Sequence, residues 1–231
     1  MNREKSRANQ LTERLVKLII EKRELNSNFY LAISGGSSPL ELFKLWRGSY
    51  KDIIDWSRVM MFWVDERAVP PQSTESNFGN AKRELLDHIP ILHSNVFRIV
   101  GENDPYLESL RYSELVKKNC DYISTDRLFD MVILGIGEDG HTASIFPGDK
   151  SMFESENLYK NSINPYSLQN RVSMTINAIE LSDNVVFYIK GETKREIIDK
   201  ILKSNTNQDV FKLPASKIVS KVGVTNIYWD L

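Results

Sequence analysis

Short apolar runs alternate with amphipathic segments along most of the chain. Six runs predict β-strands, because they are short and rich in β-branched and aromatic residues. They are "FYLAIS" (29–34), "VMMFWV" (59–64), "VFRIV" (96–100), "FDMVILGI" (129–136), "RVSMTI" (171–176) and "NVVFYIK" (184–190). Several are apolar almost without alternation, which is typical of parallel strands that helices cover on both faces.

The segments between these runs have helical spacing. We expect helices over 39–47, 77–87, 105–122 and 192–203, and an amphipathic N-terminal helix whose apolar positions are Leu11, Leu15, Leu18 and Ile19. Strands that alternate with helices favour an α/β fold: a doubly wound, mainly parallel sheet with helices on both faces, Rossmann-like. Ligands bind such sheets beyond the carboxyl ends of the strands. The loops that follow the strands are therefore the candidate site.

Two segments fit this pattern less well. The polar stretch 148–170 is expected to be a long loop or irregular insertion, either a mobile lid or plain surface. The last residues, 215–231, are expected to form a final strand or hairpin with Trp229 half-buried. With no repeats or low-complexity tracts, residues 1–231 are interpreted as a single domain.

Composition excludes several classes of protein. The 231 residues are 41% hydrophobic and 26% charged, with a formal net charge of −1. This balance disfavours nucleic acid or an anionic membrane as a partner. Cys120 is the only cysteine, which rules out an internal disulfide and a cysteine-based zinc site and suggests a reducing, cytoplasmic location. The charged N-terminus lacks a signal-peptide pattern, and no stretch approaches the ~18 apolar residues of a membrane span.

The loop "SGGSSPLELF" (34–43) follows the first predicted strand. Gly35 and Gly36 allow the backbone to approach a ligand closely. We expect Ser38 to cap a helix that Pro39 opens, with Glu41 completing a capping box. A glycine and serine loop before a helix N-terminus suits an anion such as phosphate. The alternative is a tight turn that needs glycine for its own geometry.

The loop "LGIGEDGHTASIFPG" (134–148) contains a G-x-G-x-x-G spacing, which raises the question of a dinucleotide cofactor. Such a fingerprint needs a helix and then a strand that ends in an acidic residue. Here Pro147 interrupts the expected helix, and Glu138 and Asp139 would repel a pyrophosphate. We therefore expect no cofactor and interpret this loop as catalytic.

His141 is the candidate proton carrier, because a histidine can accept and return a proton near neutral pH. Asp139 lies two residues away and could orient the ring; a purely structural histidine is the alternative. His88 and His93 have no acidic cluster or glycine loop around them and are expected at the surface. No pair of histidines has metal-ligand spacing, so we expect no metal site.

Further charged residues follow other strands. Asp65, Glu66 and Arg67 end the second strand, where α/β enzymes place functional groups, although any turn could carry such charges. Arg171 opens the fifth strand and Lys194 follows the sixth, and both could bind a phosphate. Solvated surface cations are the alternative interpretation.

Together these loops resemble the family of 6-phosphogluconolactonases and glucosamine-6-phosphate isomerases (deaminases). The resemblance rests on "SGGSSP" (34–39), "WVDERAVPPQSTESNFG" (63–79), "LGIGEDGHTASIFPG" (134–148), "RVSMTINAI" (171–179) and "KGETK" (190–194), in the family's order. One departure is Ser38, where the family more often has threonine. Arg67 and the "HTASIFPG" stretch favour the lactonase branch, since the isomerases have tyrosine and an alanine-phenylalanine-asparagine stretch there.

The resemblance implies a fold of the sugar-phosphate isomerase type and a role for each matching residue. His141 would be the catalytic base with Asp139 as its neighbour, Arg67 the active-site arginine, and Asp65 a carboxylate whose lactonase role is open. The substrate phosphate would bind Ser34, Gly35, Gly36, Ser37 and Ser38 together with Arg171 and Lys194. The implied partner is a small sugar-phosphate lactone. An isomerase or deaminase, or a non-catalytic sugar-phosphate sensor, remain the alternatives.

Overall fold

The computed structural model describes residues 5–36, 38–120, 122–204, 210–223 and 226–230. Six strands form one parallel sheet in the order β4-β2-β1-β5-β8-β9. Their bounds are β1 Phe29–Ile33, β2 Val59–Trp63, β4 Val96–Phe97, β5 Met131–Leu134, β8 Asn184–Lys190 and β9 Ile227–Asp230. If the six strands of this sheet are numbered by themselves in chain order, their order across the sheet is that of the doubly wound nucleotide-binding fold. The predicted fold class is confirmed.

A second, antiparallel sheet joins three short strands in the order β3-β7-β6. They are β3 Asp65–Arg67, β6 Tyr159–Ile163 and β7 Asn170–Met174. The run 171–176 was expected as one more strand of the parallel sheet; it instead pairs with β3, so that Arg67 stands opposite Arg171. The segment 148–170 is irregular only in part, since it contains a 3-10 helix (Lys150–Met152) and the whole of β6.

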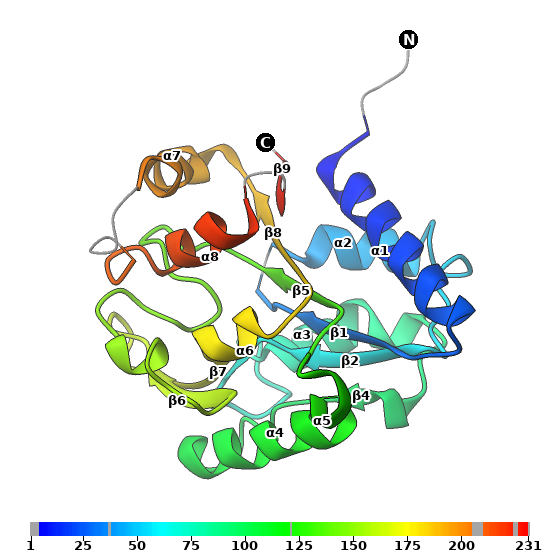
Figure 1. Cartoon of the computed structure of the whole chain (residues 1–231), viewed down its shortest axis with the longest axis horizontal. Helices are drawn as coiled ribbons and strands as arrows, with labels where there is room; N and C mark the ends of the chain where they lie inside the picture. Colours follow the sequence, from blue (N-terminus) through cyan, green and yellow to red (C-terminus); the bar gives the residue numbers. More distant parts are fainter. Residues whose placement is uncertain (1–4, 37, 121, 205–209, 224–225, 231) are drawn as a thin grey trace.

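Eight α-helices lie among the described residues, and the predicted helical segments correspond to five of them (Figure 1). Their bounds are α1 Arg7–Glu24, α2 Leu40–Arg47, α3 Asn77–Glu84, α4 Pro105–Asn119, α5 Tyr122–Thr125, α6 Ile176–Glu180, α7 Arg195–Lys203 and α8 Pro214–Val222. The chain end was expected as strand or hairpin alone, but α8 precedes β9; Trp229 is half-buried as predicted.

Apolar side chains on both faces of the sheet build the core. All residues of β1 and of β5 are buried, as the uninterrupted apolar runs predicted. On α1, Leu11, Leu15 and Ile19 are buried along one face, which contacts α2 and β9. Asp230 of β9 accepts hydrogen bonds from the Arg7 and Ala8 amides, so the last strand caps the first helix.

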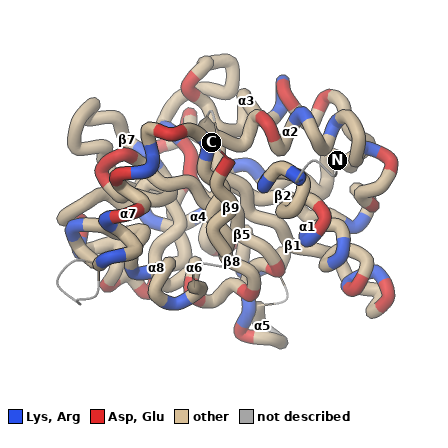
Figure 2. Tube along the Cα trace, turned by 90° about the horizontal axis from the view of Figure 1, so that it is seen from above, with Lys and Arg blue, Asp and Glu red and all other residues tan. Residues whose placement is uncertain are grey.

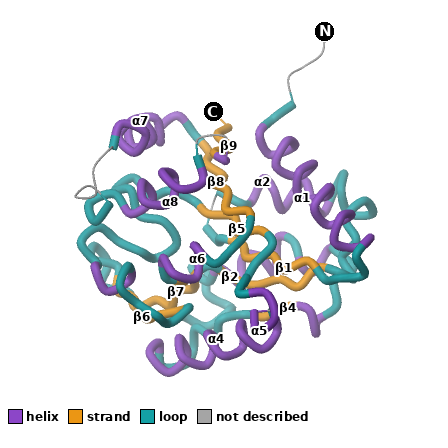
Figure 3. The backbone as a smooth tube through the Cα atoms, in the orientation of Figure 1, coloured by secondary structure: helices purple, strands orange, loops and turns teal. Residues whose placement is uncertain are grey.

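The outer surface carries charges of both signs. Basic and acidic residues both lie along α1, α2 and α7 (Figure 2), in keeping with the net charge of −1. None of the helices within the described ranges is long and apolar enough to cross a membrane. Loops make up much of the region between α8 and β6, next to α6 (Figure 3). This region includes the loop that carries His141.

Candidate active site

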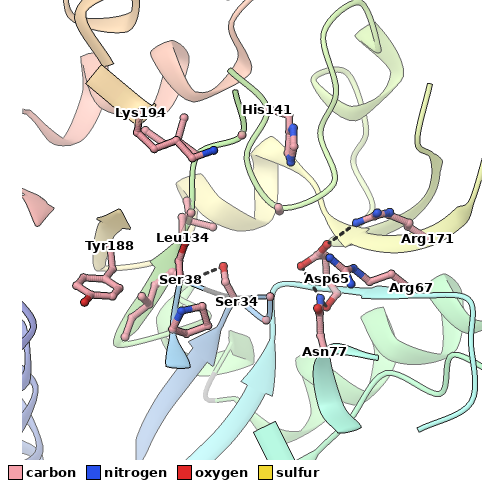
Figure 4. A pocket seen from close by; sticks show the side chains of 18 residues that line it. Ser34, Ser38, Asp65, Arg67, Asn77, Leu134, His141, Arg171, Tyr188 and Lys194 are labelled. Atoms are coloured by element: carbon pink, nitrogen blue, oxygen red, sulfur yellow. Dashed lines mark hydrogen bonds and ion pairs between the residues drawn. The ribbon is translucent and has the colours of Figure 1, made fainter. Parts of the chain in front are cut away.

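The site lies where the strand order of the parallel sheet reverses. β1 and β5 are neighbours there, and their following loops diverge to opposite sides. Ser34 ties the two strand ends together, because its amide and its Oγ both donate to the carbonyl of Ile133. A cavity of about 240 Å³ opens beyond these ends (Figure 4). This is the position at which doubly wound sheets bind ligands.

The glycine and serine loop forms one wall of this cavity, through Ser34, Gly35, Gly36 and Ser38. A Cβ atom on Gly35 would lie 2.2 Å from Asn77 Cγ, so glycine is required for close approach. Gly36 has φ +81°, a conformation that glycine adopts without strain. Ser37 was also predicted here, but it lies outside the described residues.

The capping box predicted for this loop is absent, and that expectation is wrong. Helix α2 begins at Leu40 with Pro39 at its N-cap and no side-chain cap bond. Glu41 instead pairs with Lys190 at the end of β8. Glu41 thus makes an ion pair with a residue distant in sequence and no capping bond. Ser38 therefore faces the cavity without a capping role.

His141 and Asp139 form a hydrogen-bonded pair on the loop after β5. The distance from His141 Nδ1 to Asp139 Oδ1 is 2.5 Å, and the same oxygen accepts from the His141 amide at 3.1 Å. Since a carboxylate accepts, Nδ1 carries a proton, and in the neutral imidazole it is Nε2 that has the lone pair. Nε2 has no hydrogen-bond partner within the described part of the chain, and the ring lines the cavity.

The electrostatic setting keeps Asp139 ionised. Burial alone would raise the pKa of this carboxyl, but hydrogen bonds and charge from His141 and the hydroxyl of Tyr166 outweigh it and lower the pKa to about 2. The His141 ring packs on Phe146 at 4.8 Å between centroids. No helix begins within 135–149, so the G-x-G-x-x-G loop lacks the helix a dinucleotide site needs.

Asp65 lies on the opposite wall and is almost fully buried. Its Oδ2 accepts from Ser144 Oγ at 2.6 Å, and its Oδ1 accepts from Asn77 Nδ2 at 3.1 Å. Arg171 Nη1 is 3.8 Å from Oδ2. Three segments far apart in sequence therefore hold this carboxylate. Asn77 Oδ1, buried at the cavity wall, has no partner among the residues described.

The neighbouring Glu66 has a structural role. It is 2% exposed and accepts from the amides of Asn77 and Phe78 and from Ser76 Oγ, so it caps the N-terminus of α3. Burial raises its pKa, although these hydrogen bonds act in the opposite direction. Of the three consecutive charged residues that make up β3, Asp65 and Arg67 reach the cavity.

Arg67 and Arg171 stand side by side on paired strands. Arg67 Nη1 donates to the carbonyl of Glu75, and Arg171 Nη2 donates to Gln169 Oε1 at 3.2 Å. The Nε atom of each is buried without a partner among the described residues. Burial lowers the pKa of Arg171, as does the nearby charge of Arg67, while Asp65 opposes the shift. Two arginines at one wall suit an anionic or carbonyl oxygen.

Lys194 lies on the other side of the cavity (Figure 4). The view shows it above Tyr188 and Ser38, whereas Arg171 lies beside Asp65 and Arg67. Its closest ionic partner is Glu138, with 3.9 Å between Nζ and Oε1, and the Glu138 side chain is 77% exposed. Arg171 and Lys194, the two cations predicted to bind one phosphate, therefore approach the cavity from opposite sides.

Every predicted site residue that the structure describes lines the cavity except Asp139, which binds the His141 ring behind it. Sequence reasoning missed Asn77, Ser144 and Tyr166 as contacts of this site. Asn77 and Ser144 do lie within the stretches that carry the family resemblance, whereas Tyr166 lies in the supposed lid.

Within the described ranges, no group of three or more His, Cys, Asp or Glu is arranged to hold a metal ion. His88 and His93 are exposed, as predicted.

Comparison with known proteins agrees with this geometry. Residues 2–229 match the family model of glucosamine-6-phosphate isomerases/6-phosphogluconolactonase. The 6-phosphogluconolactonase of Haemophilus influenzae is 37% identical over 224 residues, which cover 96% of this chain and 94% of the relative. That of Treponema pallidum is 32% identical and covers 81% of this chain and 78% of the relative.

Solved structures show the same fold. The 6-phosphogluconolactonase from Thermotoga maritima has a TM-score of 0.78 at 26% identity, covering 98% of this chain and 95% of that one. A monomeric glucosamine-6-phosphate deaminase has a TM-score of 0.75 at 21% identity, covering 96% and 91%. Both branches share the fold, so the backbone alone does not separate them. By its family match, its relatives and its fold, the chain belongs to the glucosamine-6-phosphate isomerase/6-phosphogluconolactonase family.

Proposed function

We propose that this protein hydrolyses 6-phospho-D-glucono-1,5-lactone to 6-phosphogluconate, a step of the oxidative pentose phosphate pathway. The observation that carries the proposal is the His141–Asp139 pair, which leaves the basic Nε2 of His141 at a cavity with cations on two sides. The lactonase names of the curated relatives, at up to 37% identity over nearly the whole chain, support the same branch.

In the proposed mechanism, His141 Nε2 takes a proton from a water molecule while the oxygen of that water attacks C1 of the lactone. The tetrahedral intermediate then collapses with cleavage of the bond between C1 and the ring oxygen. The imidazolium returns its proton to that oxygen, and the free acid ionises. Asp139 holds Nδ1 and stabilises the imidazolium while it exists. An ester this reactive needs no covalent nucleophile, and no metal or cofactor is assigned to the reaction.

Arg67 and Arg171 lie where they could stabilise the developing oxyanion, and a donor in that position typically contributes about 2.7–4 kcal/mol. Asp65 would keep these guanidinium groups in place. For the phosphate we propose Lys194 and the loop of Ser34, Gly35, Gly36, Ser37 and Ser38, which form the other side of the site. Contact between Arg171 and the phosphate stays a prediction for mutagenesis to decide.

The decisive assay measures loss of freshly made 6-phosphogluconolactone alongside ammonia release from glucosamine 6-phosphate. We expect lactone hydrolysis well above the spontaneous rate, which must be subtracted, and no ammonia. Ammonia without lactone hydrolysis would mean that the protein acts as a deaminase. Absence of both reactions, with sugar phosphate still bound, would indicate a sensor.

The His141→Asn variant tests the role of the base. General acid–base catalysis contributes roughly 10²–10⁴-fold, so the catalysed rate should fall by that factor with substrate binding little changed. A variant within a few-fold of the parent rate would remove His141 from the mechanism.

We expect the protein to act in the cytoplasm as a metabolic enzyme that binds neither nucleic acid nor membrane. The even mixture of charges over its helices supports this expectation. Fractionation of cells that express the tagged chain tests it.

A further inference from the structure

The turn between β6 and β7 reaches the catalytic loop through one side chain. Tyr166 lies on this turn and is 71% exposed, yet its hydroxyl donates to Asp139 Oδ2 at 2.9 Å. Tyr166 and Asp139 are 27 residues apart in sequence. The hydrogen bond therefore depends on the way the hairpin is placed.

The turn is held in a defined shape. Asn164 Oδ1 accepts from the amides of Tyr166 and Ser167 at 2.9 and 3.1 Å, and its carbonyl accepts from the amide of Leu168. At the base of the turn, Gln169 Nε2 donates to Glu75 Oε2, in the loop between β3 and α3, at 3.2 Å. Because the hydrogen bonds of Asn164 and Gln169 fix the backbone of this turn, the Tyr166 phenol can hold a partner in place.

Asp139 is held at both of its oxygens. Oδ1 accepts from the amide and Nδ1 of His141, and Oδ2 accepts from Tyr166. Without the phenol, only the two hydrogen bonds from His141 to Oδ1 would restrain the carboxylate, so its orientation toward the ring would be less fixed. The same interaction raises the pKa of Tyr166, because the hydroxyl proton is held by a negative charge.

We propose that Tyr166 is a positioning residue, which holds Asp139 and through it keeps the His141 ring oriented for proton transfer. The proposal rests on the proposed function for its effect on rate. Tyr166 is absent from the described residues that line the cavity, so it acts through Asp139 and not on the substrate.

The kinetic test is a double-mutant cycle. Tyr166→Phe should lower kcat about 2- to 10-fold, the rate equivalent of one hydrogen bond, with KM unchanged within about twofold. In an Asp139→Ala background, where residue 139 offers the phenol no side-chain partner, the same substitution should cause no further loss. Tyr106→Phe on α4, which is 57% exposed, is the matched control and should behave as the parent. A loss of kcat that persists beside Asp139→Ala, or a loss that appears in KM alone, would overturn the proposal.

A second measurement does not need activity. Subtracting the alkaline absorbance titration of Tyr166→Phe from that of the parent isolates the Tyr166 phenol. We expect the pKa of this phenol to lie above 10.0, the ordinary value for tyrosine, and to return toward that value in Asp139→Asn. An unchanged titration in Asp139→Asn would mean that the contact is absent in solution. If the Tyr166 phenol titrates as expected but the parent protein does not hydrolyse the lactone, the contact between Tyr166 and Asp139 stands and only the proposed function is refuted.

Discussion

Gly137 packs against the catalytic pair so closely that one methyl group should disable it. A Cβ atom at this position would lie 2.1 Å from His141 Nδ1, 2.2 Å from Cε1 and 2.7 Å from Asp139 Oδ1. Gly137 is not among the glycines with positive φ, so alanine fits the backbone. The substitution Gly137→Ala therefore acts by steric displacement of His141 and leaves the chemical identity of the pair unchanged.

The size of the effect follows from these distances. Ordinary contacts begin near 3.4 Å, so the ring must move by more than 1 Å or the loop must shift. A displacement of about 1 Å at a reacting group costs on the order of 10²-fold in rate. We expect kcat to fall about 100-fold, equivalent to about 2.7 kcal/mol, with a much smaller change in KM.

Gly135→Ala is the matched control, because a Cβ there meets nothing within 4 Å and the residue belongs to the same loop. Its methyl can raise KM, since Gly135 lines the cavity, but kcat should stay within a few-fold of the parent. Thermal melts of both variants separate displacement from unfolding. In a His141→Asn background, Gly137→Ala should have little further effect. A folded Gly137→Ala enzyme with parental kcat would refute the assigned position of the base.

Four further predictions concern the charged groups and the independence from metal ions. Lys194→Ala should raise KM about 10- to 150-fold for the phosphorylated lactone and little for gluconolactone, since a charge-assisted hydrogen bond contributes roughly 1.5–3 kcal/mol; equal impairment of both lactones would place the phosphate elsewhere. Arg171→Ala should lower kcat as well, because it leaves buried Asp65 without its cation; a change in KM for the phosphorylated lactone alone would make Arg171 a phosphate ligand. Full activity should survive exhaustive chelation, and reversible loss restored by one metal would contradict the mechanism. Because the pKa of Asp139 is lowered from 3.8 to about 2, this group stabilises the fold above pH 4 and loses that contribution as pH falls toward 2. Urea unfolding should show that Asp139→Asn costs up to about 2 kcal/mol more at pH 5.5 than at pH 2.5, and an equal cost at both would refute this.

Local patterns determined the elements and the loops that carry chemistry. The apolar runs of β1 and β5 predicted buried parallel strands, because a strand covered on both faces has no polar positions. His141 and Asp139 were identifiable together because they are two residues apart on one loop, and their hydrogen bond needs only local geometry. Residues at the ends of β1, β2 and β5 could be assigned to one site, because the carboxyl ends of parallel strands meet at one edge.

Tertiary structure alone decided which distant groups meet. Ser144 reaches Asp65 across 79 residues, and Tyr166 reaches Asp139 across 27, through pairings that no short sequence window contains. The run 171–176 was expected to join the parallel sheet, yet strand 170–174 pairs with β3 and thereby places Arg171 beside Arg67, away from Lys194. The spacing of apolar residues along the sequence indicates which face of a single helix or strand is buried. The partner of each strand depends instead on the packing of the whole chain, because strand-to-strand hydrogen bonds are equally available to any extended backbone.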